Sequence, residues 1–422
     1  MPALTPAGAR PRILIVTHSN YEEDPRVRRQ AEALVAAGLA VDVLGLRKPG
    51  ASAREQIEGV QVHRLPVQRH QGAGIGTYLA EYAEFFGRAA VAAVRLHARR
   101  RYRLAQVATL PDPLVFAMAP LRLHGVPVML DLHEAMPEFF RSRFPAASHG
   151  IVRGGLLAAE RASITFATHV LTVNDALGDR LVELGVSRSK VSVVLNSPRS
   201  DRFDPSAHPR RPFMADGRLR LVYAGALTPL YQLDVVVQAV SLLARGAAAG
   251  AVGGPDGSGG PDGAGAAPLD VTLDLYGRGD AEALLRALAE ERGIADRVRF
   301  HGRIPVEEVA ARIAEADVGL APTRRDAFTD FSLSTKIFEY AAMGKPVVAS
   351  RLPTVERYFG AEALAYFVPG DPPSLAATVR RLVDDPALRE AATVAAADRV
   401  RELSWEREAE RYVALVRGFA GV

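Results

Sequence analysis

The sequence predicts an α/β fold made of two Rossmann-like, doubly wound domains that face a cleft. Short buried strands alternate with amphipathic helices along nearly all of the 422 residues, which is typical of parallel sheets built from βα units. A proline-rich stretch, residues 197–217, interrupts this alternation near the middle of the chain. Since the chain is too long for one ordinary domain, this stretch is expected to be an interdomain linker.

The first half is expected to contain buried strands with helices between them. After the strand at 12–17, Asp24 caps a helix that has Pro25 in its first turn and ends at Gly38. A long helix is expected at 77–101. Further strands of this half are expected at 39–46, 60–65, 104–109, 127–132, 169–173 and 191–195.

A second alternating series begins after the linker. One segment of this half, residues 246–268, consists almost entirely of Gly, Ala, Pro, Asp and Ser. It has too little apolar surface to offset the entropy of ordering, so it is expected to be a flexible surface insertion. Strands of this half are expected at 219–224, 271–275, 298–301, 317–321, 346–349 and 364–368.

The composition excludes several classes of protein. Apolar residues make up 48% and charged residues 24%, and 52 basic against 48 acidic residues leave a net charge of +4, too small for a nucleic-acid-binding protein. No cysteine is present, which excludes disulfides and thiolate sites. Residues 1–11 lack the apolar core of a signal peptide and no apolar run is long enough to span a membrane, so a cytoplasmic location is expected.

The most informative stretch, residues 334–350, predicts a short helix followed by a buried strand. Ser334 or Thr335 can cap this helix. Lys336 stands in its first turn, where a cation opposes the helix dipole unless an anion binds there. Glu339 shares a face with this lysine, and a cation for phosphate beside a carboxylate for hydroxyl groups suits a sugar nucleotide. The alternative is an ordinary amphipathic helix with an exposed Lys–Glu pair.

Other unusual residues follow predicted strands, at the edge where parallel sheets bind ligands. Glycines in the second half allow close approach of a ligand to the backbone, at Gly225, Gly277 and Gly302. In the first half, His133 and Glu134 follow one strand and Asn196 follows another. For His133, a ligand-binding role is weighed evenly against that of an ordinary packed histidine.

Several other chemistries lack a sequence signal. The ten histidines are scattered without the paired spacing of a metal site. No Gly-x-Ser-x-Gly elbow, Walker loop or dinucleotide fingerprint occurs. A basic run at the end of the long helix, Arg99, Arg100, Arg101 and Arg103, is expected to be a solvated helix end, and contact with anionic lipid is the alternative.

Together these residues resemble the retaining glycosyltransferases of family four, which have the GT-B fold. Ser334–Ser350 resembles their donor-binding Lys-x-x-Glu-Tyr-x-x-x-Gly-x-Pro-Val element, and Asp131–Glu134 is similar to their Asp-x-His-Glu segment. Leu403–Glu406 looks like the start of their closing helix. The resemblance implies an acceptor-binding domain at 1–197, a nucleotide-sugar-binding domain at 198–403, and a helix 404–422 that packs back on the first domain.

The resemblance implies transfer of a sugar, with retained anomeric configuration, from a nucleoside-diphosphate sugar to an acceptor hydroxyl, with no metal or other cofactor. Lys336 would stabilise diphosphate, Glu339 would accept hydrogen bonds from ribose, and His133 would touch the sugar. These three form the expected catalytic set. The expected donor-binding set is Gly225, Gly277, Gly302, Arg303, Ser334, Thr335 and Asn196. The acceptor stays open between a lipid-linked glycan, which would bring peripheral contact with the inner membrane face, a polysaccharide and a small molecule.

The sequence departs from the family pattern at three positions. Phe331 stands where the family has the first of two glutamates, while Ala226 and Tyr231 replace the Arg and Lys of its phosphate clamp. The remaining basic candidates for phosphate contact include Lys336 and Arg303. Two alternatives therefore stay open, a non-catalytic nucleotide-sugar-binding protein and a nucleotide-sugar epimerase of the same fold.

Overall fold

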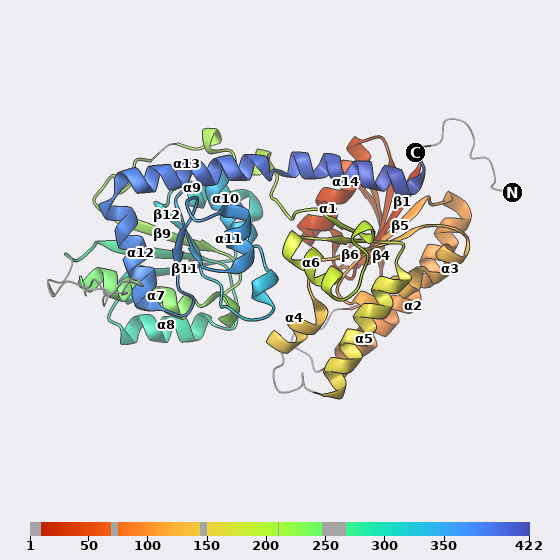
Figure 1. Ribbon diagram of the computed structural model, residues 1–422, viewed down its shortest axis with the longest axis horizontal. Helices are drawn as coiled ribbons and strands as arrows, with labels where there is room; N and C mark the ends of the chain where they lie inside the picture. Colours follow the sequence, from red (N-terminus) through yellow and green to blue (C-terminus); the bar gives the residue numbers. More distant parts are fainter. Residues whose placement is uncertain (1–9, 69–74, 144–149, 210, 247–266) are drawn as a thin grey trace. The chain divides into compact units, whose positions relative to one another are not determined.

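The computed structural model divides into two compact units, each of which carries a parallel sheet and its covering helices (Figure 1). Unit 1 contains residues 1–196 and 407–422, and unit 2 contains residues 197–406. The structure describes residues 10–68, 75–143, 150–209, 211–246 and 267–422. The predicted insertion at 246–268 therefore lies almost entirely outside the described residues.

Unit 1 is built on a sheet with the strand order β3-β4-β2-β1-β5-β6-β7-β8. Neighbouring strands are parallel, except that β3 pairs with β4 in the antiparallel sense. The strands are β1 (Arg12–Val16), β2 (Ala40–Leu46), β3 (Arg54–Ile57), β4 (Val60–Leu65), β5 (Leu104–Ala108), β6 (Val128–Leu132), β7 (His169–Thr172) and β8 (Val191–Val193). Edge strand β3 is not predicted from the sequence, because it is polar and largely exposed.

The helices of unit 1 are α1 (Pro25–Ala36), α2 (Ile75–Arg100), α3 (Ala119–Leu123), α4 (Met136–Arg143), α5 (Ile151–Phe166), α6 (Asp175–Glu183) and, from residue 407 onward, α14 (Trp405–Ala420). Asp24 caps α1 as expected, since its carboxylate accepts a hydrogen bond from the backbone N–H of Val27. Within unit 1, α14 is fixed through buried polar contacts. The hydroxyl of Tyr412 donates to Gln106 Oε1 at 2.7 Å, and Glu408 accepts from the backbone N–H of Leu195.

Unit 2 has the parallel strand order β11-β10-β9-β12-β13-β14. The strands are β9 (Leu219–Ala224), β10 (Val271–Tyr276), β11 (Val298–Gly302), β12 (Val318–Ala321), β13 (Val347–Ser350) and β14 (Ala365–Phe367). The helices are α7 (Leu233–Arg245), α8 (Glu282–Glu291), α9 (Val309–Ala314), α10 (Thr335–Ala342), α11 (Pro353–Phe359), α12 (Pro372–Asp384) and α13 (Pro386–Glu402). The predicted fold class, two α/β domains with parallel sheets, is confirmed.

The strand orders locate the position at which each sheet is expected to bind a ligand. In unit 1 the chain builds outward from β1 to one side and then continues from β5 to the other. In unit 2 it does the same from β9 and then from β12. Ligands bind at such switch points, beyond the carboxyl ends of the strands. The residues expected near a ligand are therefore those that follow β1, β5 and β6 in unit 1 and β9, β10 and β11 in unit 2.

In the part of the chain that the structure describes, no helix is both long enough and apolar enough to cross a bilayer.

Candidate functional site

In unit 2 the side chain of Lys336 reaches from α10 to the carboxyl end of β9. Lys336 is only 8% exposed, and its terminal atoms lie over the backbone of Gly225, the residue that follows β9. A Cβ built on Gly225 would overlap Cε of this lysine and would lie 2.8 Å from Nζ. The missing side chain at Gly225 therefore provides the space in which the ammonium lies.

A second glycine brings the next loop to the same place. A Cβ built on Gly277, which follows β10, would overlap the carbonyl oxygen of Gly225. Gly277 also has a φ of 147°, which disfavours any other residue, and its N–H donates to the carbonyl oxygen of Gly302 at 2.8 Å. The structure thus brings together the three glycines that the sequence analysis names in this half.

The ammonium of Lys336 faces aromatic rings. Nζ lies 4.0 Å from the ring centroid of Tyr231 and 5.2 Å from that of Tyr223. Within the described residues, it makes no hydrogen bond or ion pair. The alternative of an exposed Lys–Glu pair is therefore wrong, because this lysine is buried. A buried ammonium without an ionic partner is unusual, because buried charges in proteins are normally paired.

A nearby lysine shows the opposite arrangement. Nζ of Lys345 donates to the carbonyl oxygens of Ala314 and Ala316, both at 2.7 Å, at the end of α9. Burial lowers the pKa of Lys345, and the nearby Asp317 opposes that effect. Its hydrogen bonds explain Lys345 as a structural residue that caps a helix terminus, whereas no such partner explains Lys336.

The helix that carries Lys336 is fixed by Tyr340. The hydroxyl of Tyr340 accepts a hydrogen bond from the backbone N–H of Ala224 at 3.0 Å, which ties α10 to the end of β9. Ser334 occupies the cap position of α10, but its side chain makes no capping hydrogen bond, so the expected side-chain cap is wrong. Ser334, Thr335 and Glu339 are half-buried, and Arg303 is exposed beyond β11.

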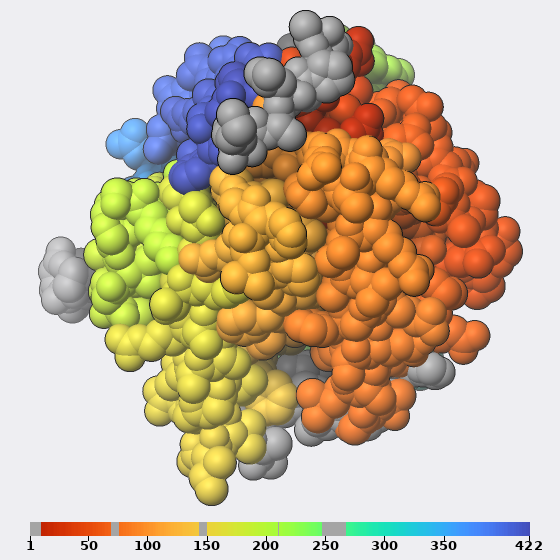
Figure 2. Space-filling model, turned by 90° about the vertical axis from the view of Figure 1, so that its right-hand side faces the viewer, coloured from red at the N-terminus to blue at the C-terminus, as the bar shows by residue number. Residues whose placement is uncertain are grey.

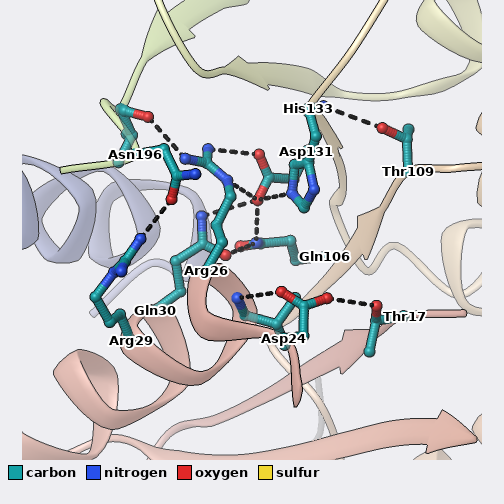
Figure 3. Close-up of polar contacts among 12 residues, drawn as sticks. Thr17, Asp24, Arg26, Arg29, Gln30, Gln106, Thr109, Asp131, His133 and Asn196 are labelled. Carbon is teal, nitrogen blue, oxygen red and sulfur yellow. Dashed lines mark hydrogen bonds and ion pairs between the residues drawn. The ribbon is translucent and has the colours of Figure 1, made fainter. Parts of the chain in front are cut away.

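In unit 1 a buried carboxylate organises the corresponding strand ends (Figure 3). Asp131, near the end of β6, has no exposed surface. Its carboxylate accepts hydrogen bonds from Arg26 Nη2 at 2.8 Å, Arg26 Nε at 3.2 Å, Gln30 Nε2 at 2.8 Å and Gln106 Nε2 at 3.2 Å. Burial opposes ionisation of Asp131, but the Arg26 guanidinium and His133 outweigh it and hold the pKa well below its usual range.

His133 is held beside this carboxylate. Its Nε2 lies 3.2 Å from Asp131 Oδ2, an ion-pair distance at which the hydrogen-bond geometry is not met. Its backbone N–H donates to Oγ1 of Thr109, which follows β5 (Figure 3). The side chain is 19% exposed, so it is accessible at the switch point of this sheet. Asp131 thus lies beside Nε2 of a ring that is partly exposed.

Asn196, a member of the expected donor-binding set, lies in unit 1, the half of the chain in which the sequence places it. Its Oδ1 accepts a short hydrogen bond from Arg29 Nη2 (Figure 3). In the basic run at the end of α2, Arg99, Arg101 and Arg103 are exposed as expected, whereas Arg100 is half-buried. It pairs with the buried Asp42, together with Arg12.

Several buried polar residues of unit 1 are not predicted from the sequence. Arg26 and Gln30 lie on the buried face of α1, so the sequence signal for them is a polar residue at a core position of an amphipathic helix.

Asp112, which follows β5, is fully buried and neither carboxylate oxygen has a hydrogen-bond partner among the described residues. Burial, and then the nearby Glu160, raise its pKa well above the usual range, so this carboxyl favours its uncharged form.

Metal binding finds no support in the described residues, since no group of three or more His, Asp or Glu side chains there could hold an ion.

Two family models match the chain, one over each half. A glycosyl transferase 4-like domain matches residues 24–197, and the glycosyl transferases group 1 model matches residues 218–385. A D-inositol 3-phosphate glycosyltransferase of Thermomonospora curvata is 29% identical over 206 residues, which make up 47% of this chain and 42% of that protein. A glycogen synthase of Mycobacterium tuberculosis is 24% identical over 410 residues, 93% of this chain and 91% of that protein. The chain spans less than half the length of several of the relatives that it matches, between 35% and 45%.

Solved structures agree on the fold. The sucrose-phosphate synthase of Thermosynechococcus elongatus superposes with a TM-score of 0.76 at 20% identity, over 98% of this chain and 100% of that one. HepE from Anabaena, solved in complex with UDP-glucose, superposes with a TM-score of 0.68 at 14% identity, over 96% of this chain and 99% of that one. Identities this low establish the architecture and nothing further.

Proposed function

We propose that this chain, which belongs to the group 1 glycosyltransferases of the GT-B fold, transfers a sugar from a nucleoside-diphosphate sugar to an acceptor hydroxyl with retention of configuration. The observation that carries this proposal is the buried ammonium of Lys336 above Gly225. A diphosphate is the anion that it would meet. The activity, the donor and the acceptor are all part of the proposal.

The chemistry asked of Lys336 is stabilisation of the leaving group. When the bond between sugar and diphosphate breaks, negative charge develops on the diphosphate oxygens. An ammonium already in place, together with N–H groups at the start of α10, lowers the energy of that charge without reorganisation. Glu339, one turn further along α10, would accept hydrogen bonds from the ribose hydroxyls. Gly225 and Gly277 would let the phosphates approach the backbone.

Unit 1 would bind the acceptor and would contact the sugar through His133. The carboxylate of the buried Asp131 lies 3.2 Å from Nε2 of the His133 ring, while the Arg26 guanidinium keeps that carboxylate ionised. An imidazole held in this way can donate to or accept from a sugar hydroxyl with little loss of side-chain entropy. The reaction would need no metal, because positively charged protein groups would neutralise the leaving diphosphate.

The proposal is tested by nucleotide binding and by product analysis. UDP is the first probe, since HepE, a structural neighbour, is solved with UDP-glucose, and GDP and ADP complete the panel. Titration calorimetry of Lys336→Ala should show at least tenfold weaker binding with a melting temperature that is unchanged or slightly raised. The matched control, Lys345→Ala, should lower the melting temperature and leave the affinity unchanged.

Activity is measured as UDP release from UDP-glucose, with NMR analysis of the anomeric configuration of the product. A product with inverted configuration would overturn the retaining mechanism. Tight donor binding without hydrolysis or transfer would favour a non-catalytic binding protein. Interconversion of the sugar without its transfer would favour an epimerase. Unaltered nucleotide affinity in Lys336→Ala would remove the observation on which the proposal rests.

We also propose that unit 1 makes peripheral contact with an anionic membrane through α2. Figure 2 shows α2 in orange and α5 in yellow on one face of this unit. Apolar side chains of α2 are exposed, namely Leu79 at 63%, Val91 at 50%, Val94 at 43% and Phe86 at 36%. Arg88 and Arg95 are exposed on the same helix, and such a mixture suits an anionic lipid surface. Co-sedimentation with vesicles that contain phosphatidylglycerol, but not with neutral vesicles, is the expected result, and equal sedimentation with both would contradict it.

A further inference from the structure

We propose that Tyr231 is a positioning residue for Lys336, whose ammonium it stabilises without neutralising its charge. The inference rests on the proposed function, because it assumes that Lys336 meets a diphosphate. It goes beyond that proposal in assigning a role to a residue that stands where the related family has a lysine. Tyr231 would then support phosphate binding through its ring and not through a charge of its own.

The geometry places the ring directly beside the ammonium. Nζ of Lys336 lies 4.0 Å from the centroid of the Tyr231 ring, well inside the range of a cation–π interaction. The ring of Tyr223 lies further away, with its centroid 5.2 Å from Nζ. The hydroxyl of Tyr223 donates to the carbonyl oxygen of Ala226 at 2.7 Å, so this second ring is fixed by its own hydrogen bond.

The short helix that carries the ring is itself fixed. Tyr231 ends the 3-10 helix Pro229–Tyr231, which follows β9. The carbonyl oxygen of Leu230 accepts a hydrogen bond from the backbone N–H of Arg324 at 2.8 Å, so a second loop of unit 2 holds this helix in place. The next residue, Gln232, has a left-handed φ of 39°, and α7 starts directly after it. The ring is therefore presented by anchored backbone.

Two groups lie close to the end of the Lys336 side chain. The backbone of Gly225 lies near Cε and Nζ, and the centroid of the Tyr231 ring lies 4.0 Å from Nζ. A mobile lysine side chain loses much rotamer freedom if it becomes ordered only when its ligand binds. Here these contacts exist before the ligand binds, so less entropy is lost when a phosphate arrives.

An aromatic ring and a carboxylate differ in their effect on the charge of Lys336. A carboxylate beside Lys336 would stabilise the buried ammonium but would also cancel its charge and compete with phosphate. The face of an aromatic ring attracts a cation through its quadrupole and carries no net charge. The positive charge of Lys336 therefore remains available to an anion. This is the physical reason for a tyrosine at position 231.

The experiment is a double-mutant cycle with UDP as the probe, measured by titration calorimetry. Tyr231→Leu should weaken UDP binding about two- to thirtyfold, the range to which cation–π energies convert. Tyr231→Phe keeps the ring face and should stay within about twofold of the parent protein. In the Lys336→Ala background, Tyr231→Leu should have almost no further effect, because the ring would act only through the lysine. Melting temperatures are recorded for every variant, and Tyr231→Met replaces Tyr231→Leu if the leucine variant does not fold.

The outcomes separate the inference from the proposed function. An equal loss of affinity from Tyr231→Leu with and without Lys336 would overturn the inference, because Tyr231 would then act on UDP or on the fold directly. Unchanged UDP affinity in Tyr231→Leu would also overturn the inference about Tyr231. If Lys336→Ala still bound UDP more weakly in that case, the proposed function would stand. If Lys336→Ala itself binds UDP normally, the proposed role of Lys336 fails and the inference fails with it.

Discussion

Asp131→Asn is expected to lower the free energy of unfolding by about 3–5 kcal/mol, the cost of breaking a buried ion pair. Asp131 has no exposed surface and Arg26 is only 4% exposed. The guanidinium donates Nε and Nη2 to this carboxylate and Nη1 to the carbonyl oxygen of Val194 at 2.9 Å. An asparagine has almost the same shape, so the main change is a buried guanidinium without its counter-charge.

The magnitude follows from the contacts. The carboxylate accepts four hydrogen bonds, from Arg26, Gln30 and Gln106. Charged hydrogen bonds contribute about 1.5–3 kcal/mol each, so a simple sum would exceed the loss of the pair. An asparagine keeps one acceptor oxygen, while its amide group would face donors, so part of the network survives. The figure for a broken buried pair is therefore the better guide.

The assay is urea denaturation followed by circular dichroism, with hydrogen exchange of the β6 amides to assign the change to unit 1. The exposed Glu183 supplies the control, since Glu183→Gln should change the free energy of unfolding by no more than about 0.5 kcal/mol. A loss below about 1 kcal/mol for Asp131→Asn would refute the argument, because the pair could not then be the element that holds β6 to α1.

Three further predictions concern other parts of the chain. Burial opposes ionisation of Asp42, but His63 and Arg100 outweigh it and lower the pKa of this carboxyl. The ionised Asp42 therefore stabilises the folded protein fully above the unfolded pKa of about 4, and this stabilisation is lost as the pH falls further. The urea midpoint should drop with acidification, and the drop should be smaller in Asp42→Asn. Gly277→Ala should lower the free energy of unfolding by about 1–3 kcal/mol or more and impair UDP binding, because the new Cβ would overlap the carbonyl oxygen of Gly225. A normal melting temperature would contradict this. Glu339→Gln should weaken UDP binding by about 1–3 kcal/mol in calorimetry, since it removes the charge that strengthens the ribose hydrogen bonds, and an unchanged Kd would argue against a ribose contact.

The sequence predicts the fold because its information is local. Buried strands, helix caps such as Asp24 and the glycines after β9 and β10 are visible within a few residues, and the alternation of elements specifies parallel sheets. Edge strand β3 is missed since it is polar and buries little. The cap at Ser334 is wrong because the residue is in the right place but its side chain points to no helix amide.

The candidate site is predicted only in part, for a physical reason. Lys336 stands out because a cation at a helix start is locally unfavourable. Its partner ring at Tyr231 lies about a hundred positions earlier, and Arg26 and Asp131 are 105 positions apart. Such contacts depend on how distant strands and helices pack, and residue spacing along the chain carries no signal for them.

The division of unit 1 into two chain segments affects the order in which the protein can fold during synthesis. Residues 407–422 belong to unit 1, although all of unit 2 is made before them. At about 5–20 residues per second, the ribosome needs on the order of 10–40 s to add unit 2. During that time Gln106 lacks the Tyr412 hydroxyl and the backbone N–H of Leu195 lacks Glu408. Unit 2, which is continuous in the chain, can be completed first, and the earlier unit waits for the last helix to leave the ribosome.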